Sequence, residues 1–242
     1  MKFFTVGLLA SIALASPIID PSFVNEQANN EITTPKILNC NSTQTVQLKK
    51  YYKDLIEFST IAKQNLLKNG GDDQVFKNWF GKGNPLTVLG IIDEVLEGNK
   101  DGVLYRCDDI DGDCAAHPTE WPGYHRSSDD HSGETVICDL FFNSKHPIEK
   151  FCSEGDILTI KPKTYAGIDL FHRFLHLSKI NKGYYGEYAE EFKDLLDYAE
   201  NNITFAVLNT DNILYYIAES YSLNLTGSDS CLGNLSNSTL TN

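Results

Sequence analysis

Two histidines one helical turn apart are the residues of this chain best suited to chemistry. They lie in His172-Arg173-Phe174-Leu175-His176, where a zinc metallopeptidase carries the pattern H-E-x-x-H. At positions i and i+4 of a helix, both imidazoles lie on one face and can share a metal ion. In the peptidases, the Glu of the motif is the general base that deprotonates the attacking water. Because Arg173 stands at that position, the motif keeps two metal ligands and lacks the usual base.

A third metal ligand is expected downstream of the histidines. A catalytic zinc takes three protein ligands and a structural zinc takes four. Four acidic residues cluster at the start of the next predicted helix: Glu187, Glu190, Glu191 and Asp194. Glu187 and either Glu190 or Glu191 would share a face there. The alternative is a solvated acidic face beside the positive end of the helix dipole.

Two aspartates are candidates for orienting the metal ligands. Asp169 lies four residues before Arg173, so a surface ion pair worth a few tenths of a kcal/mol is its simplest interpretation. Hydrogen bonding to a metal-bound histidine is the alternative. Asp211 lies in Asn209-Thr210-Asp211-Asn212, where capping of the last helix is expected and orientation of a ligand is the alternative.

The N-terminus has the three parts of a secretory signal. Lys2 precedes an apolar run over residues 3–14, and Ala13-Leu14-Ala15 supplies the small residues of a cleavage site. We therefore expect a signal peptide over residues 1–15 and an exported protein, free in the medium or associated with the cell wall. No second apolar run reaches the length of a membrane span. Cleavage leaves about 227 residues, which suits a single domain.

Charge and cysteine content fit the same compartment. The formal net charge of −13 argues against nucleic acids and anionic membranes as partners and favours cations. Six cysteines in an exported chain indicate up to three disulfides, with fifteen possible pairings that the sequence leaves open. Cys107 with Cys114 and Cys40 with Cys231 are two of the pairings considered. The full set is Cys40, Cys107, Cys114, Cys138, Cys152 and Cys231.

Sequons for N-glycosylation agree with export. They occur at Asn41, Asn202, Asn224, Asn234 and Asn237. Three of them fall in the last twenty residues, and we expect an exposed and mobile tail over residues 233–242.

The elements that position the histidines are mainly helices. Apolar residues at a 3.6 period predict helices over 43–68, 73–80, 84–96, 165–177, 187–201 and 210–221. Segments rich in β-formers predict strands over 102–107, 134–142 and 156–160. Residues 16–39 lack periodicity and are expected to form a flexible leader.

The long polar loop over residues 108–133 offers weaker candidate sites. Its Asp108-Asp109-Ile110-Asp111-Gly112-Asp113 run has oxygen donors, but it departs from the EF-hand pattern, and a turn between cysteines is the preferred interpretation. Four histidines could form a second zinc site, but their spacing matches no known zinc-binding motif. A solvated loop is therefore the preferred interpretation. The four histidines are His117, His125, His131 and His146.

Several phrases together resemble the fungal HRXXH putative-peptidase family. They are His172–His176, Gly183-Tyr-Tyr-Gly-Glu-Tyr-Ala-Glu-Glu191, Asn209-Thr-Asp-Asn-Ile-Leu-Tyr-Tyr216, Cys107-Asp-Asp-Ile-Asp-Gly-Asp-Cys114 and Cys231-Leu-Gly-Asn-Leu235. The family includes secreted, pH-regulated and allergenic fungal antigens and is distantly similar to the deuterolysins. The resemblance implies an α+β, mainly helical zincin-like fold over residues 40–232, with a small sheet and disulfides. Aligning the NTDN phrase with deuterolysins implies Glu190 as the third zinc ligand, with Glu187 as the second choice.

The resemblance and the residues together give three hypotheses. The first is a secreted, noncatalytic zinc-binding glycoprotein that handles extracellular zinc at the fungal surface through His172, His176 and Glu190. The second is a zinc metalloendopeptidase that uses another base, with Arg173 holding an oxyanion. The third is a structural wall antigen without metal. The expected partners are a zinc ion and either a cell-surface protein or a cell-wall glycan.

Overall fold

The sheet is small and joins strands that are far apart in the sequence. The structure, a computed structural model, describes residues 33–126, 128–227 and 230–233, all within the unit Thr33–Asn242. The strands are β1 (Lys36–Leu38), β2 (Leu104–Arg106), β3 (Gly123–His125) and β4 (Glu134–Ile137), in the order β1-β2-β4-β3. β2 pairs in parallel with both β1 and β4, and β3 pairs antiparallel with β4.

Helices make up most of the described chain. The longer ones are α2 (Ser42–Asn69), α3 (Gln74–Phe80), α4 (Pro85–Glu97), α7 (Ala166–His176), α9 (Phe192–Asn201) and α11 (Thr210–Thr226). The short ones are α5 (Asp113–Ala116), α6 (Asp139–Ser144), α8 (Ser178–Asn181) and α10 (Ile203–Ala206). Four single 3-10 turns complete the elements: Gly70–Asp72, Asp129–His131, Ile148–Lys150 and Pro162–Thr164. None of the helices in the described residues has the length and apolar character of a membrane span.

The long helix α2 is specified by its own sequence. Asn41 and Gln44 form a capping box, in which Asn41 Oδ1 accepts from Gln44 N at 2.9 Å and Asn41 N donates to Gln44 Oε1 at 3.0 Å. The helix ends at Gly70, whose φ of 66° lies in the left-handed region that favours glycine. The helix predicted over residues 43–68 is therefore confirmed.

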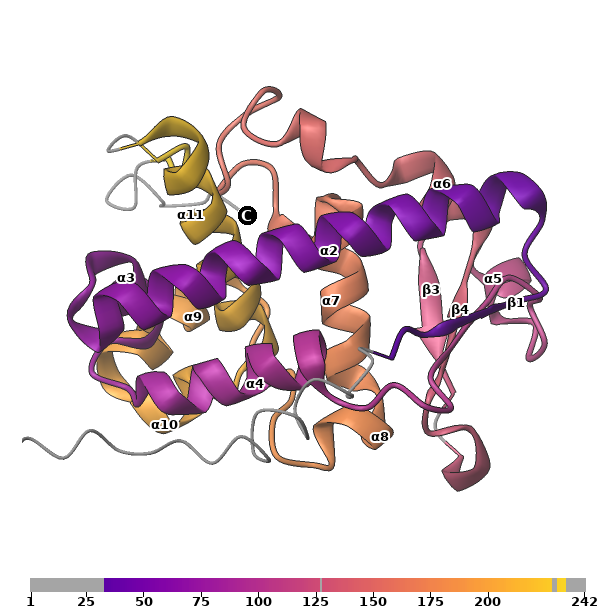
Figure 1. Cartoon of the computed structure of the whole chain (residues 1–242), viewed down its shortest axis with the longest axis horizontal. Helices are drawn as coiled ribbons and strands as arrows, with labels where there is room; N and C mark the ends of the chain where they lie inside the picture. The colour runs from indigo at the N-terminus through magenta and orange to yellow at the C-terminus, as the bar shows by residue number, and fades with distance from the viewer. Residues whose placement is uncertain (1–32, 127, 228–229, 234–242) are drawn as a thin grey trace, which may run out of the picture. The chain divides into compact units, whose positions relative to one another are not determined.

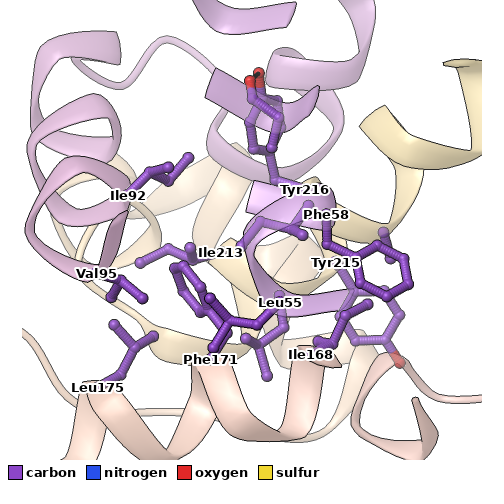
Figure 2. Packing of buried hydrophobic residues seen from close by; sticks show 14 of the residues in the cluster. Leu55, Phe58, Ile92, Val95, Ile168, Phe171, Leu175, Ile213, Tyr215 and Tyr216 are labelled. Carbon is purple, nitrogen blue, oxygen red and sulfur yellow. Dashed lines mark hydrogen bonds between the residues drawn. The ribbon is translucent and has the colours of Figure 1, made fainter. Parts of the chain in front are cut away.

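The core lies where α2, α7, α4 and α11 meet. Figure 2 shows Leu55 and Phe58 of α2 among Ile168, Phe171 and Leu175 of α7, with α4 and α11 side chains around them. In Figure 1, α7 crosses α2, with the sheet on one side and α9 and α11 on the other. Gly167 allows the close approach, because a Cβ there would lie 2.7 Å from Leu55 N. The helix that carries the histidine pair is thus fixed on several sides.

The disulfides pair differently from the two pairings considered above. They join Cys40 to Cys107, Cys114 to Cys138 and Cys152 to Cys231. Cys40 and Cys107 follow the parallel strands β1 and β2, so both reach the same edge of the sheet. Both Cys107–Cys114 and Cys40–Cys231 are therefore wrong. The pairing depends on β1, which lies inside the segment that the sequence assigned to a flexible leader.

Other boundaries also differ from the predictions. Two strands are confirmed in shorter form, as β2 and β4, and α6 begins at Asp139 inside the segment predicted as strand 134–142. Residues 156–160 form turns, in which Ile157 N and Leu158 N donate to carbonyls of Cys231 and Leu232. The loop over 108–133 contains α5 and β3.

The secretion signals fall partly outside the described residues. Residues 1–32, which hold the predicted signal peptide and most of the leader, and sequons Asn234 and Asn237 lie outside them. The other three sequon asparagines, Asn41, Asn202 and Asn224, are exposed. Their positions are accessible for glycosylation.

A buried carboxyl in the core gives a pH-dependent prediction. Glu219 is 4% exposed and accepts from Trp79 Nε1 at 2.6 Å. Burial raises its pKa to about 7, above its ordinary value of 4.5. The folded state therefore holds a proton that the unfolded state has lost, so the free energy of unfolding falls as pH rises from about 4.5 to 7. We expect Glu219→Gln to remove about 1–3 kcal/mol of this fall between pH 5 and 8.

Urea unfolding at several pH values measures this contribution. Glu200→Gln, at an exposed helical position, is the control and should leave the pH dependence as in the parent. If Glu219→Gln and the parent lose stability equally over this range, the Glu219 carboxyl is not protonated in the folded protein.

Candidate metal centre

The two histidines meet on one face of α7. The buried face of this helix carries Ile168, Phe171, Phe174 and other apolar residues, which leaves the opposite face to the histidines. His172 Nε2 and His176 Nε2 lie 2.8 Å apart. Their side chains are only 17% and 22% exposed. The helix predicted over 165–177 is confirmed, and it brings both ring nitrogens to one point.

Glu187 supplies the carboxylate closest to this pair. Its Oε1 lies 3.1 Å from His172 Nε2, and its Oε2 lies 3.5 Å from His176 Nε2. Ligands of a tetrahedral zinc ion at about 2.05 Å would stand about 3.3 Å from each other. The observed separations of 2.8 to 3.5 Å bracket that value. Two imidazole nitrogens and one carboxylate are also the donor set that zinc prefers, so these residues fit the ion.

The structure does not favour Glu190, the first choice from the sequence. The Glu190 side chain is 62% exposed, and its Oε2 contacts Lys163 Nζ at 3.3 Å. Its carboxylate groups with Glu187 and Asp211 rather than with the histidines. The physical reason is that α9 begins at Phe192, not at Glu187, so residues 187–191 lie outside a helix and do not share a helical face.

Asn209 fixes the non-helical segment that carries Glu187. Its Oδ1 accepts from Tyr188 N at 2.8 Å and from Ala189 N at 3.1 Å, and its Nδ2 donates to Ala189 O at 2.9 Å. The backbone adds Gly186 N to Leu208 O and Thr210 N to Gly186 O. Asn209 is fully buried, so these bonds are shielded from water. Asn209, at the start of α11, therefore determines where the Glu187 side chain lies relative to the two histidines.

Lys163 lies among three carboxylates behind the histidine pair. Its Nζ is 3.2 Å from both Glu187 Oε1 and Asp211 Oδ1, and 3.3 Å from Glu190 Oε2. Burial raises the pKa of the Asp211 carboxyl to about 7, although the Lys163 charge opposes the shift. Asp211 is not the N-cap of α11, because Asn209 holds that position, so the predicted cap is wrong. Asp211 instead contacts Lys163, which also contacts Glu187.

Local electrostatics suit cation binding at the histidines. Burial lowers the pKa of His172, and it lowers the pKa of His176 to about 4. The hydrogen bond with His172 holds the pKa of Glu187 well below its usual range. At neutral pH the rings are therefore neutral, with lone pairs free to coordinate, beside an ionised carboxylate.

Arg173 is buried, although it lines the same cavity as the two histidines. It is 8% exposed, and its Nε donates to Asp169 Oδ2 at 2.7 Å. Lys145 Nζ contacts the other oxygen of Asp169 at 2.7 Å, and the Arg173 guanidinium lies 5.6 Å from the Phe141 ring centre. The charges of Arg173 and Lys145 outweigh burial and hold the pKa of Asp169 at about 2. The predicted Asp169–Arg173 pair exists, but it is a core pair and not a surface pair.

The histidines open into a cleft of about 720 Å³. One wall includes Glu187 and Lys163, and another comes from β3 and the residues before it, with Trp121 and His125. The His125 ring stacks on the His176 ring, with the centres 5.1 Å apart and the planes at 14°.

The remaining loop candidates have other partners. His117 stacks on Trp121, His131 contacts Glu134, and His146 contacts Glu154. With His125 beside His176, these four histidines do not come together as a second site.

The acidic loop is likewise occupied by protein contacts. Asp108 pairs with Arg106, and Asp111 pairs with Arg126. Asp109 accepts from Cys114 N and Ala115 N at the start of α5. These carboxylates are used in holding the loop together, which agrees with the preferred interpretation over calcium.

Three residues of the centre could not be identified from the sequence. Lys163 and Asn209 show no motif of their own, although Asn209 lies in the NTDN phrase. The sequence places His125 only in a possible second zinc site, because nothing in the sequence predicts that β3 pairs with β4.

Known proteins resemble this chain in sequence and in fold. A family model described as HRXXH, putative peptidase family, matches residues 14–234. Protein ZPS1 of Saccharomyces cerevisiae is 43% identical, over 97% of this chain and 98% of that protein. The pH-regulated antigen PRA1 of Candida albicans is 31% identical, over 93% of this chain and 78% of that protein. Both similarities extend over nearly all of this chain.

Among solved structures, a zinc peptidase from Grifola frondosa has a similar fold. The TM-score is 0.53 at 15% identity, and the match covers 76% of this chain and 99% of that chain. The expected fold class, mainly helical with a small sheet and disulfides, is confirmed, and the fold is similar to that of this peptidase.

Proposed function

This chain belongs to the HRXXH putative peptidase family, and on that premise we propose that it is a secreted, noncatalytic zinc-binding protein of the fungal surface. The observation that carries the proposal is the convergence of His172 Nε2, His176 Nε2 and the Glu187 carboxylate within 3.5 Å of one another. A bound zinc ion would supply a Lewis acid at this point. The similarity to a fold titled zinc peptidase supports zinc as the ion.

Position 173 supports the noncatalytic part of the proposal. The general base of the peptidase motif would stand there, and this chain has an arginine whose guanidinium is paired with Asp169. The carboxylates grouped with Glu187 are those of Glu190 and Asp211, and both contact Lys163. Both carboxylates therefore face the Lys163 ammonium rather than the converging histidine nitrogens.

The proposed location rests on several independent features. An N-terminal apolar segment with a small-residue cleavage site indicates export, and three disulfides fit an oxidising compartment. Relatives named antigens, including the pH-regulated antigen PRA1, fit a protein exposed outside the cell. We propose residues 1–15 as signal peptide and a zincin-like domain that begins at β1. A glycosylated tail would follow it over residues 233–242. Extracellular zinc handling, with a surface protein or wall glycan as second partner, completes the proposal.

A zinc metalloendopeptidase is the second candidate function, favoured by the fold and by the cleft beside the histidines. Digestion of casein by the zinc-loaded protein separates the two. We expect no cleavage above that of the His172→Ala/His176→Ala variant. Cleavage that a chelator abolishes and that this variant lacks would establish the peptidase instead.

The role of Asn209 gives a further prediction about zinc binding. Asn209→Ala removes three hydrogen bonds that hold the segment of Glu187, so zinc affinity should fall about 10- to 100-fold. Competition with a chromophoric chelator measures the change. Asn201→Ala, which removes an exposed hydrogen bond to Asp197, is the control and should bind zinc like the parent. Equal affinity in the two variants would show that Asn209 does not position a ligand.

A further inference from the structure

His125 lies against the metal centre from the opposite wall of the cleft. It is the last residue of β3, pairs with Thr135 of β4 and is exposed to solvent. Its ring stacks on His176, whose Nε2 is one of the converging ligand atoms. Coordination by His125 would require its ring to turn from this stacked position to another side-chain rotamer.

Several other charged side chains near the centre already have partners. Asp211 and Glu190 contact Lys163, Asp169 is paired with Arg173 and Lys145, and Lys163 is itself a cation. For His125, the contact that the described residues provide is the stacked His176 ring. His125 is thus a neighbouring nitrogen donor that lies directly against one of the ligand rings.

We propose that His125 is the fourth protein ligand of the zinc site and closes it. The proposal rests on the proposed function, because it requires zinc at His172, His176 and Glu187. A site with four protein ligands holds its ion without a position for water, whereas a catalytic site keeps that position open. Closure by His125 agrees with the absence of a general base at position 173, and it makes this a site for holding zinc rather than for hydrolysis.

The test compares His125→Phe with His117→Phe. Phenylalanine keeps a ring that can stack on His176 but has no nitrogen, and His117 stacks on Trp121 in the same loop as a matched control. We expect His125→Phe to weaken zinc binding at least about tenfold and His117→Phe to leave it within about twofold. In the cobalt-substituted protein, His125→Phe should also replace the absorption of a four-coordinate tetrahedral ion with the weaker bands of a hydrated one.

Zinc X-ray absorption of the unaltered protein gives an independent count of the imidazole ligands and does not depend on the folding of a variant. Outer-shell scattering from three imidazoles supports the proposal, and scattering from two overturns it. Parent-like affinity and cobalt spectrum in His125→Phe also overturn it, while leaving the three-ligand site intact. If the unaltered protein takes up no zinc, the proposed function fails, and this inference fails with it.

Discussion

Replacing Arg173 by methionine is expected to lower the free energy of unfolding by about 3 kcal/mol, because it breaks a buried ion pair. Arg173 is 8% exposed and Asp169 is 3% exposed, so the carboxylate would stay in the core with one cation fewer. Lys145 still contacts Asp169, which places the effect at the lower end of the usual range. Urea unfolding of the purified variant measures the loss.

A double-mutant cycle separates the pair from the loss of packing. With Asp169→Asn as the second change, the pair should show a coupling energy of about 1–3 kcal/mol. Lys182→Met removes an exposed cation that contacts Glu94 at 3.4 Å, and should cost less than about 0.5 kcal/mol. If Arg173→Met and Lys182→Met lower the free energy of unfolding equally, the Asp169–Arg173 pair is not a buried ion pair that stabilises the fold.

The same pair determines how a restored catalytic base must be tested. Arg173→Glu alone would place a second carboxylate beside Asp169 in the core, and loss of folding would then hide any gain of hydrolysis. Asp169→Asn/Arg173→Glu removes that repulsion and retains Lys145, the other cation beside position 169. Hydrolysis should therefore be sought in the double variant.

The second large effect is expected for zinc affinity at the acidic segment. Glu187→Gln removes the carboxylate nearest both histidines, so affinity should fall at least about 100-fold. Glu190→Gln makes the same change of charge three residues away and also removes a contact with Lys163, but it should change affinity less than about threefold. Competition titration gives both values. A larger loss of zinc affinity in Glu190→Gln than in Glu187→Gln would identify Glu190 as the third ligand, as the resemblance to deuterolysins implies.

The sequence predicted the histidine half of this centre because its geometry is local. The i, i+4 spacing in a helix with an apolar face is enough to place His172 and His176 together. Glu187 could not be distinguished from Glu190 in this way, because Asn209, a partner distant in the sequence, holds the segment in a non-helical conformation. A helical pattern that begins at Glu187 is also plausible in isolation, and only the tertiary hydrogen bonds exclude it.

Burial and long-range pairing account for the other differences. The spacing of Asp169 and Arg173 predicts their contact, but burial depends on the helices packed around α7. Cys40 could be paired with Cys107 only by recognising β1, and a three-residue strand gives too little pattern. His125 reaches His176 only because β3 pairs with β4.

Zinc content after dialysis against a weak chelator tests the central claim most directly. The unaltered protein and the His172→Ala/His176→Ala variant are purified and dialysed side by side. We predict near-stoichiometric zinc in the first and a loss of nearly all of it in the second, because two of the converging ligand atoms are removed. Equal zinc contents in the two proteins would show that these histidines do not form a metal site.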